Sequence, residues 1–213
     1  METEVRFYYS LDSENKIIEK LKTIEGLIYD DRYYEKTDQY NHPMKEYNFY
    51  SKEIDGRFRV RKTENDNKSK CMITWKRRIN NETGIIHQEE EVELSIDPKE
   101  YDNLEFLLKN VLHLDLVESY ERYRSLFHND DVEIVVDKYP FGIAIEIENK
   151  SKTKDGIEVV KEWTQRIGLD INKAYTLSWD DKYTSLCREQ NKNIESIVRF
   201  DKDMPKVNNK FDK

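Results

Sequence analysis

Residues 57–61 read Arg-Phe-Arg-Val-Arg, so three cations alternate with two apolar side chains. Successive side chains of a β-strand point to opposite faces of a sheet, and this stretch therefore predicts a strand with one cationic and one apolar face. The same period of two recurs at residues 2–7, 74–76, 91–94, 122–124 and 145–148. A less charged strand is predicted over residues 132–137, before the turn residues 139–142.

The charged faces are sorted by sign from strand to strand. The cationic stretches are 57–61, 74–78 and 122–124, and the anionic stretches are 2–4, 91–93 and 146–148. Polar alternation is most often a sign of a sheet with one solvated face. However, like charges on one strand face lie only about 6–7 Å apart, and a face in water has no reason to sort them by strand. We therefore expect the charged faces to meet one another in the interior.

A closed antiparallel barrel would satisfy this requirement, because its lumen holds the charges and closure removes exposed strand edges. Helices would then cover the apolar outer face. That face carries Phe58, Val60, Trp75, Val92, Leu94, Ile145 and Ile147. The predicted fold class is α+β, a closed antiparallel barrel with helices packed on its outside.

Four segments have the pattern of amphipathic helices. One follows Ser13, with apolar residues at helical spacing from Ile17 onward. Another begins at Asp97-Pro98, an N-cap followed by proline at the first helical position. Its predicted apolar stripe is Tyr101, Leu104, Leu107, Leu108 and Val111. The other two are predicted from Asp155 to Gly168 and from Ser178 to about Glu189.

Composition limits the class of protein. Of 213 residues, 38% are charged, 37% are hydrophobic and 12% are aromatic, and the net charge is −8. The aromatic content is too high for a disordered chain, and no apolar run approaches the ~20 residues of a membrane helix. We expect one domain over residues 1–190. A tail follows over residues 191–213, and its end has little apolar periodicity and is predicted to be mobile.

The sequence also bears on location and partners. The opening residues lack the cationic and apolar segments of a signal peptide, and two cysteines do not make a disulfide scaffold, so we expect a cytoplasmic protein. The net charge argues against DNA as a partner. The four histidines share no metal-ligand spacing, and Cys71 has no partner base in view, so we expect no catalytic role for them.

The predicted lumen combines two chemistries. Its cations are Arg6, Arg57, Arg59, Arg61, Lys76, Arg78, Arg122 and Arg124. Its acids are Glu2, Glu4, Glu91, Glu93, Asp137, Glu146 and Glu148. Guanidinium forks match phosphate oxygens, and carboxylates bind hard divalent cations such as Mg²⁺ or Mn²⁺. Together the two sets predict a site for phosphoryl transfer on a polyphosphate.

In their order along the chain, these motifs resemble the CYTH, or triphosphate tunnel metalloenzyme, superfamily. That superfamily is named for a class IV adenylyl cyclase and mammalian thiamine triphosphatase. The matching residues are Glu2-x-Glu4-x-Arg6, Arg59-x-Arg61, Thr74-x-Lys76, Glu91-x-Glu93, Arg122-x-Arg124, Asp137, Gly142 and Glu146-x-Glu148. The match runs from Glu2 to about Leu186. Each motif alone is common, and only the ordered set is specific.

The resemblance implies an eight-stranded antiparallel tunnel that holds a divalent metal and a triphosphate. It places the metal at Glu2, Glu4, Glu146 and Glu148, while Glu91, Glu93 and Asp137 hold either a second metal or the basic side chains. It places the triphosphate along Arg57, Arg59, Arg61, Lys76, Arg122 and Arg124, with Arg78 extending the row. Water activated by the metal would attack the terminal phosphorus. The catalytic residues that we predict are Glu2, Glu4, Arg6, Lys76, Glu91 and Glu93.

Two positions depart from the superfamily pattern. Arg6 stands where the superfamily usually has lysine, and arginine is bulkier and forked, so the exchange is not neutral. Arg77-Arg78 follows Lys76, where the superfamily often has glycine. Both departures bear on the substrate more than on the fold.

Three functional classes remain open. The first, which we favour, is a hydrolase that releases phosphate from tripolyphosphate, a nucleoside or organic triphosphate, or an RNA 5′ end. The second is a class IV-type adenylyl cyclase that makes cyclic AMP and pyrophosphate. The third is a polyphosphate-binding module without activity, which the retained carboxylates disfavour because acids weaken the binding of anions. The sequence leaves the oligomeric state open, with a homodimer among the options.

Overall fold

The structure of the protein is a computed structural model, and it describes residues 3–50, 55–79 and 88–212. The described residues divide into two compact units. The extent of one domain over residues 1–190 stays a prediction. Unit 1 comprises residues 34–121 and 196–198, and unit 2 comprises residues 3–33, 122–195 and 199–212.

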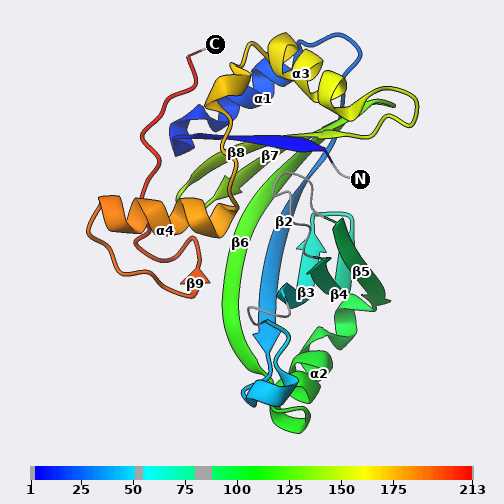
Figure 1. The fold of residues 1–213 in the computed structure, drawn as a ribbon, viewed down its shortest axis with the longest axis vertical. Coiled ribbons are helices and arrows are strands. Elements are labelled where there is room, and N and C mark those ends of the chain that lie inside the picture. Colours follow the sequence, from blue (N-terminus) through cyan, green and yellow to red (C-terminus); the bar gives the residue numbers. More distant parts are fainter. Residues whose placement is uncertain (1–2, 51–54, 80–87, 213) are drawn as a thin grey trace. The chain divides into compact units, whose positions relative to one another are not determined.

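The chain folds as α+β, as predicted, and Figure 1 shows the elements. The strands are β1 (Glu4–Tyr9), β2 (Ile28–Asn41), β3 (Asp55–Glu64), β4 (Ser69–Ile79), β5 (Gln88–Ile96), β6 (Asp115–His128), β7 (Val132–Tyr139), β8 (Gly142–Asn149) and β9 (Ile197–Val198). The helices are α1 (Glu14–Lys22), α2 (Tyr101–Phe106), α3 (Gly156–Ile167) and α4 (Trp179–Glu189).

Eight strands follow one another in the order β1-β8-β7-β6-β2-β3-β4-β5, and the short β9 pairs with β6 in parallel. The other strand pairs whose register is defined are antiparallel. Closure of this sheet into a barrel stays a prediction. No helix in the described part of the chain has the length and apolar character of a membrane span.

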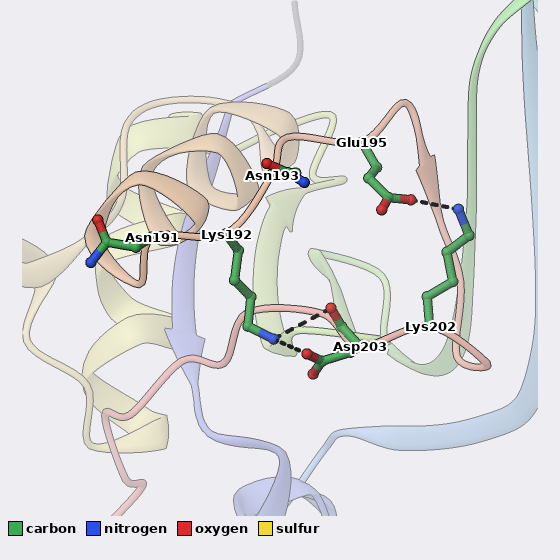
Figure 2. A pocket seen from close by; sticks show the side chains of 6 residues that line it. All are labelled: Asn191, Lys192, Asn193, Glu195, Lys202 and Asp203. Atoms are coloured by element: carbon green, nitrogen blue, oxygen red, sulfur yellow. Dashed lines mark hydrogen bonds and ion pairs between the residues drawn. The ribbon is translucent and has the colours of Figure 1, made fainter.

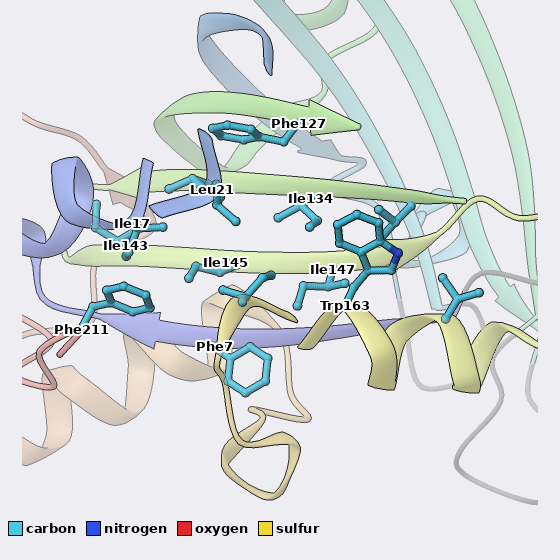
Figure 3. Close-up of a cluster of buried hydrophobic side chains, with 14 residues drawn as sticks. Phe7, Ile17, Leu21, Phe127, Ile134, Ile143, Ile145, Ile147, Trp163 and Phe211 are labelled. Atoms are coloured by element: carbon cyan, nitrogen blue, oxygen red, sulfur yellow. The ribbon is translucent and has the colours of Figure 1, made fainter. Parts of the chain in front are cut away.

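In unit 2 the apolar face of the sheet is covered by α1 and α3, as Figure 3 shows for the central side chains. Strands β1, β7 and β8 supply alternate residues to this core, among them Phe7, Ile145 and Ile147. Helix α1 adds Ile17 and Leu21, and α3 adds Val159, Trp163 and Ile167. Each fully buried side chain of this size contributes about 1.5–3 kcal/mol. The prediction that Ile145 and Ile147 lie beneath helices is therefore confirmed.

The predicted helix boundaries in unit 2 are confirmed by their caps. Asp155 accepts hydrogen bonds from the backbone N–H groups of the first turn of α3, and Gly168 ends that helix at φ 85°. Ser178 and Asp181 form a capping box at the start of α4. Helix α1 begins directly after Ser13, at the residue that the sequence predicts.

The C-terminal tail is not the loose end that its composition predicts. Met204, Val207 and Phe211 are buried, and Phe211 joins the core of unit 2. The backbone N–H of Val207 donates to the carbonyl of Phe141 at 2.8 Å, and the N–H of Phe211 donates to the Ser13 hydroxyl at 3.1 Å. Three widely spaced apolar residues are enough to hold this extended segment, although they form no helical or strand period.

In unit 1 the apolar face of β2, β3 and β4 packs against α2 and the π-helical turn Leu107–Val111 that continues it. Tyr40, Val60 and Leu108 are buried there, with Tyr101 and Leu104 packed against them. Leu107 and Val111 are exposed, so the predicted stripe of this helix is wrong at two positions. The π-helical turn shifts the side chains away from a 3.6-residue period, which explains the difference.

The predicted cover of β5 is also wrong in the described structure. Val92 and Leu94 are 51% and 57% exposed, although they alternate with acids as the sequence suggests. Strand β5 stands at the end of the strand order, next to β4 alone. Alternation therefore predicted the strand correctly, but it could not show which face is covered.

A buried polar cluster joins α2 to β2. The Asp38 carboxylate is almost fully buried and accepts hydrogen bonds of 2.5 Å from the hydroxyls of Ser119 and Tyr101. The ammonium of Lys36 lies 2.9 Å from the same carboxylate. Burial alone would raise the pKa of Asp38, but these three donors hold it below its ordinary value.

We predict that Asp38→Asn lowers the stability of the protein by about 3 kcal/mol, because Lys36 loses its buried partner. The folded-state pKa of Asp38 lies below its unfolded value of about 3.9, so its contribution is complete above that pH and is lost as the pH falls through the folded-state pKa. Urea unfolding at pH 7 and pH 3 measures both effects. Asp66→Asn, in an exposed turn, is the control. Equal stability of the two variants at pH 7 would contradict the prediction.

Candidate functional site

The cations of β3 form a row on one face of unit 1. Arg57, Arg59 and Arg61 alternate with Phe58 and Val60, and the latter two belong to the apolar core. Across β4, Arg57 stands opposite Lys76, and Arg59 stands opposite Thr74. Opposed residues of an antiparallel pair share a face, so Lys76 extends the cationic row. The sidedness of β3 predicted from the sequence is confirmed.

Arg59 is the central member of this row. It is largely buried, and its Nε has no hydrogen-bond partner among the described residues. Burial, followed by the positive charges of Arg57 and Arg61, lowers its pKa, although Tyr120 and Glu118 oppose the shift. Arg61 donates from Nε to the Thr37 hydroxyl at 3.1 Å. The surroundings of Arg59 therefore do not fully compensate its charge.

Acids on β5 face the basic side chains of β4. Lys76 Nζ lies 3.2 Å from a carboxylate oxygen of Glu91, and Glu93 stands opposite Thr74 in the register. Arg77 pairs with Glu90 at 2.7 Å on the other face of the strands. The backbone of Arg78 belongs to β4, but its side chain lies outside the described ones.

In unit 2 two predicted cations converge on one acid. Asp137 is 0% exposed and accepts two hydrogen bonds from Arg124, at 2.7 and 2.8 Å. Arg122, only 5% exposed, donates to the same carboxylate at 2.9 Å and to the Tyr139 hydroxyl at 3.1 Å. Asp137 therefore orients both guanidinium groups. Its alternative role as a metal ligand stays a prediction.

Arg6 is surrounded by acids. Its Nε lies 2.7 Å from a Glu146 oxygen, and its NH2 lies 3.5 Å from Glu4. Burial disfavours the charge of Arg6, but Glu146, together with Tyr8, Tyr139 and Glu4, raises its pKa above the ordinary value. Arg6 thus neutralises Glu146, a predicted metal ligand. It does so with a guanidinium fork, which a lysine would lack.

The carboxylates of unit 2 form a row across three strands. Glu4 on β1 stands opposite Glu148 on β8, and Glu148 stands opposite Glu133 on β7. His128 on β6 stands opposite Glu133 and ends the row. Directly opposed like charges destabilise a sheet unless a cation compensates them. Lys150 supplies part of this compensation, 2.6 Å from Glu148.

The donor set of this row suits a divalent cation, because carboxylate oxygens are the ligands that Mg²⁺ and Mn²⁺ prefer. Among residues 3–50, 55–79 and 88–212, no three His, Cys, Asp or Glu side chains gather closely enough to hold a metal ion. Glu2, a predicted ligand, lies outside the described residues. Sequence reasoning missed Glu133, whose signal was a single acid in the otherwise apolar strand 132–136.

Along β1, the polar face of unit 2 runs from Glu4 past Arg6 and ends in aromatic side chains. Tyr8 and Tyr139 alternate with core residues on β1 and β7, and they contact residues near α4 in place of α1 or α3. Tyr8 meets Tyr175 edge to face, and Tyr139 stacks on Trp179. Helix α4 and the segment before it therefore pack on the charged side of this sheet, a placement that its sequence did not indicate.

A separate pocket lies at the C-terminal end of α4 (Figure 2). Its charged side chains are already paired with one another. Lys192 contacts Asp203 at 2.5 Å, and Lys202 contacts Glu195 at 2.6 Å. It contains none of the residues that the sequence predicts for the site.

Comparison with solved structures shows the fold that this chain shares. The PH1819 protein from Pyrococcus horikoshii is 25% identical, with a TM-score of 0.59 over 89% of this chain and 99% of that chain. The PH1012 protein from the same organism is 19% identical, with a TM-score of 0.59 over 84% and 97%. A candidate adenylate cyclase from Vibrio parahaemolyticus is 15% identical, with a TM-score of 0.58 over 84% and 95%.

A second candidate adenylate cyclase, from Bacillus halodurans, is 15% identical with a TM-score of 0.54. No family model matches the chain. No curated protein matches it either. The similarity therefore shows a common fold, and it agrees with the superfamily that the motifs resemble.

We predict that Asp137→Asn lowers the stability by about 3–5 kcal/mol, because two buried guanidinium groups lose their counter-charge. Thermal unfolding without added metal measures this effect. Asp130→Asn, at an exposed turn position, should unfold like the wild type. An Asp137→Asn protein with the wild-type unfolding temperature would show that Asp137 does not hold the arginines in place.

Proposed function

We propose that the protein is a divalent-metal-dependent hydrolase that releases phosphate from a triphosphate. The observation that carries the proposal is the arginine row of unit 1, in which the Nε of half-buried Arg59 is buried between two like charges and lacks a partner among the described residues. A buried cation that the protein leaves incompletely neutralised is stabilised by a bound anion.

The row favours an anion with several oxygens. Alternate residues of a strand are about 6–7 Å apart, and arginine side chains are long enough for neighbours to reach successive phosphates. Guanidinium forks bind phosphate oxygens in pairs, so Arg57, Arg59 and Arg61 suit a chain of phosphates better than a single small anion. Lys76 is the further cation of this row that we assign to the substrate, and Arg78, Arg122 and Arg124 are assigned on the sequence pattern alone.

We assign the metal to Glu4 and Glu148, with Glu133 as an additional ligand and with Glu2 and Glu146 from the sequence pattern. A bound Mg²⁺ or Mn²⁺ supplies charge stabilisation to the phosphoryl oxygens. Arg6 neutralises Glu146 beside this row. A water oxygen attacks the terminal phosphorus, the bridging P–O bond breaks, and a carboxylate of the row accepts the proton of the water. Tripolyphosphate then yields phosphate and pyrophosphate.

A second candidate is adenylyl cyclase activity, because two proteins that share the fold are named as candidate adenylate cyclases. The same phosphate-binding residues would then act while the ribose 3′-hydroxyl displaces pyrophosphate from ATP. An RNA 5′-triphosphatase uses the same chemistry on a larger substrate, and the net charge of −8 makes it the weaker choice.

A substrate panel separates these activities. Tripolyphosphate, ATP, thiamine triphosphate and triphosphate-ended RNA are incubated with Mg²⁺ or Mn²⁺, and phosphate, pyrophosphate and cyclic AMP are measured separately. We expect phosphate release that a chelator abolishes. Cyclic AMP with pyrophosphate would identify a cyclase, and triphosphate binding without turnover would identify a binding module.

We predict that Arg59→Met and Glu4→Gln each reduce kcat/KM by about 10²–10³-fold, because each removes charge stabilisation at the reacting phosphates. Initial rates at saturating metal measure this loss, and circular dichroism verifies the fold. Arg77→Met and Glu90→Gln are matched controls, since this ion pair lies on the opposite face of β4 and β5. Wild-type rates in Arg59→Met or Glu4→Gln would refute the assignment of these residues.

A further inference from the structure

The segment before α4 is fixed against β1. The backbone N–H of Tyr175 donates to the Arg6 carbonyl at 2.7 Å. The Arg6 guanidinium donates in turn to the Leu177 carbonyl at 3.4 Å. These two contacts place the first turn of α4 beside the polar face of β1, where Tyr8 follows Arg6 on the same face.

The Tyr8 hydroxyl is a buried donor that no described residue pairs with. The side chain is held between Tyr175 and Phe141, and the residue is only 7% exposed. Its oxygen is buried and makes no hydrogen bond with the described residues. Leaving such a group unsatisfied costs about 1–3 kcal/mol. Phenylalanine would fill this position without that cost, so the hydroxyl calls for an acceptor that the described residues do not supply.

Lys182, in the first turn of α4, lies over the same ring. Its Nζ is 5.9 Å from the centroid of Tyr8 and 5.3 Å from that of Tyr175. Among the described residues it makes no ion pair. The neighbouring Asp181 is engaged in the capping box with Ser178. A half-buried ammonium thus lies close to the ring of a buried phenol whose hydroxyl makes no hydrogen bond with the described residues.

We propose that Tyr8 and Lys182 form an anion-binding subsite of unit 2, in which both donate to a phosphate oxygen of a triphosphate ligand. The inference rests on the proposed function. Both groups are donors and one is cationic, so the ligand is an anionic oxygen and not a metal or a neutral base. Neither residue belongs to the motifs that predicted the site.

The chemistry of both residues suits this role. Burial, followed by the neighbouring Tyr139, raises the pKa of Tyr8 well above its ordinary value, so the phenol remains a donor at any working pH. Lys182 has a long flexible side chain, and in the described part of the chain no ion pair or side-chain hydrogen bond restrains its ammonium. Its displacement from the ring is the simplest way for a phosphate oxygen to reach the hydroxyl.

Binding of imidotriphosphate, in which N–H groups replace the bridging oxygens of tripolyphosphate, tests the subsite. Isothermal titration calorimetry in Mg²⁺ compares the wild type with Tyr8→Phe and Lys182→Met. We expect each variant to bind about 10-fold more weakly, the effect of one lost hydrogen bond to a charged group. Without ligand, Tyr8→Phe should unfold at the wild-type temperature or above it, because the lost hydroxyl had no partner.

Two residues outside the subsite provide matched controls. Tyr9 lies next to Tyr8 but packs against Phe211 on the opposite face of β1, so Tyr9→Phe should bind like the wild type. Lys161→Met, at an exposed position of α3, should do the same. Wild-type affinity in Tyr8→Phe or Lys182→Met would overturn the subsite, and so would a lowered unfolding temperature of Tyr8→Phe.

The outcomes also separate this inference from the proposed function. If the wild type does not bind imidotriphosphate, both the function and the subsite are wrong. If the wild type binds and Arg59→Met does not, while the two subsite variants bind normally, only the subsite is wrong.

Discussion

A guanidinium group that leaves water needs a counter-charge, and this requirement organises the polar faces of both units. Alternation along β1, β3 and β6 directs charged side chains to one side while their neighbours build the cores. The cores are ordinary: isoleucine, valine and aromatic residues beneath amphipathic helices. The polar faces are not, because they hold arginines in largely buried positions. The way each unit compensates those charges indicates which of its arginines can bind an anion.

The two units solve this problem differently. In unit 2, Asp137 neutralises two arginines and Glu146 neutralises Arg6 at short distances, which gives a rigid network of ion pairs. In unit 1, Arg59 stands between Arg57 and Arg61, and no such acid contacts its Nε among the described residues. A network that is already satisfied can orient groups, whereas an incompletely neutralised row can bind an anion. This contrast is the physical basis for assigning phosphate recognition to the β3 row. The opposed carboxylates of Glu4 and Glu148 have the opposite charge, and a divalent cation would stabilise this pair.

Several site features were predictable because they depend on period and order alone. The sidedness of Arg57, Arg59 and Arg61 follows from the alternation of 57–61, and the pairing of Lys76 with Glu91 agrees with the charge sorting of two strands. Glu133 was missed, since an isolated acid in an apolar strand has no pattern around it, and only its register with Glu148 makes it part of a row. Tyr8 and Lys182 were missed for a related reason. They come together through the docking of α4 on β1, a contact between segments about 170 residues apart.

The sequence by itself determined the strands, their two-faced character, the helix starts at Asp97, Asp155 and Ser178, and the chemistry of the polar faces. These properties are local, because a period of two, a cap or a charge is fixed by neighbouring residues. Only the tertiary structure decided which acid meets which base, that Val92 and Leu94 stay exposed, and that Met204, Val207 and Phe211 anchor the tail. Those outcomes depend on strand register and on which surface another element covers, and both are set by contacts between residues far apart in the chain.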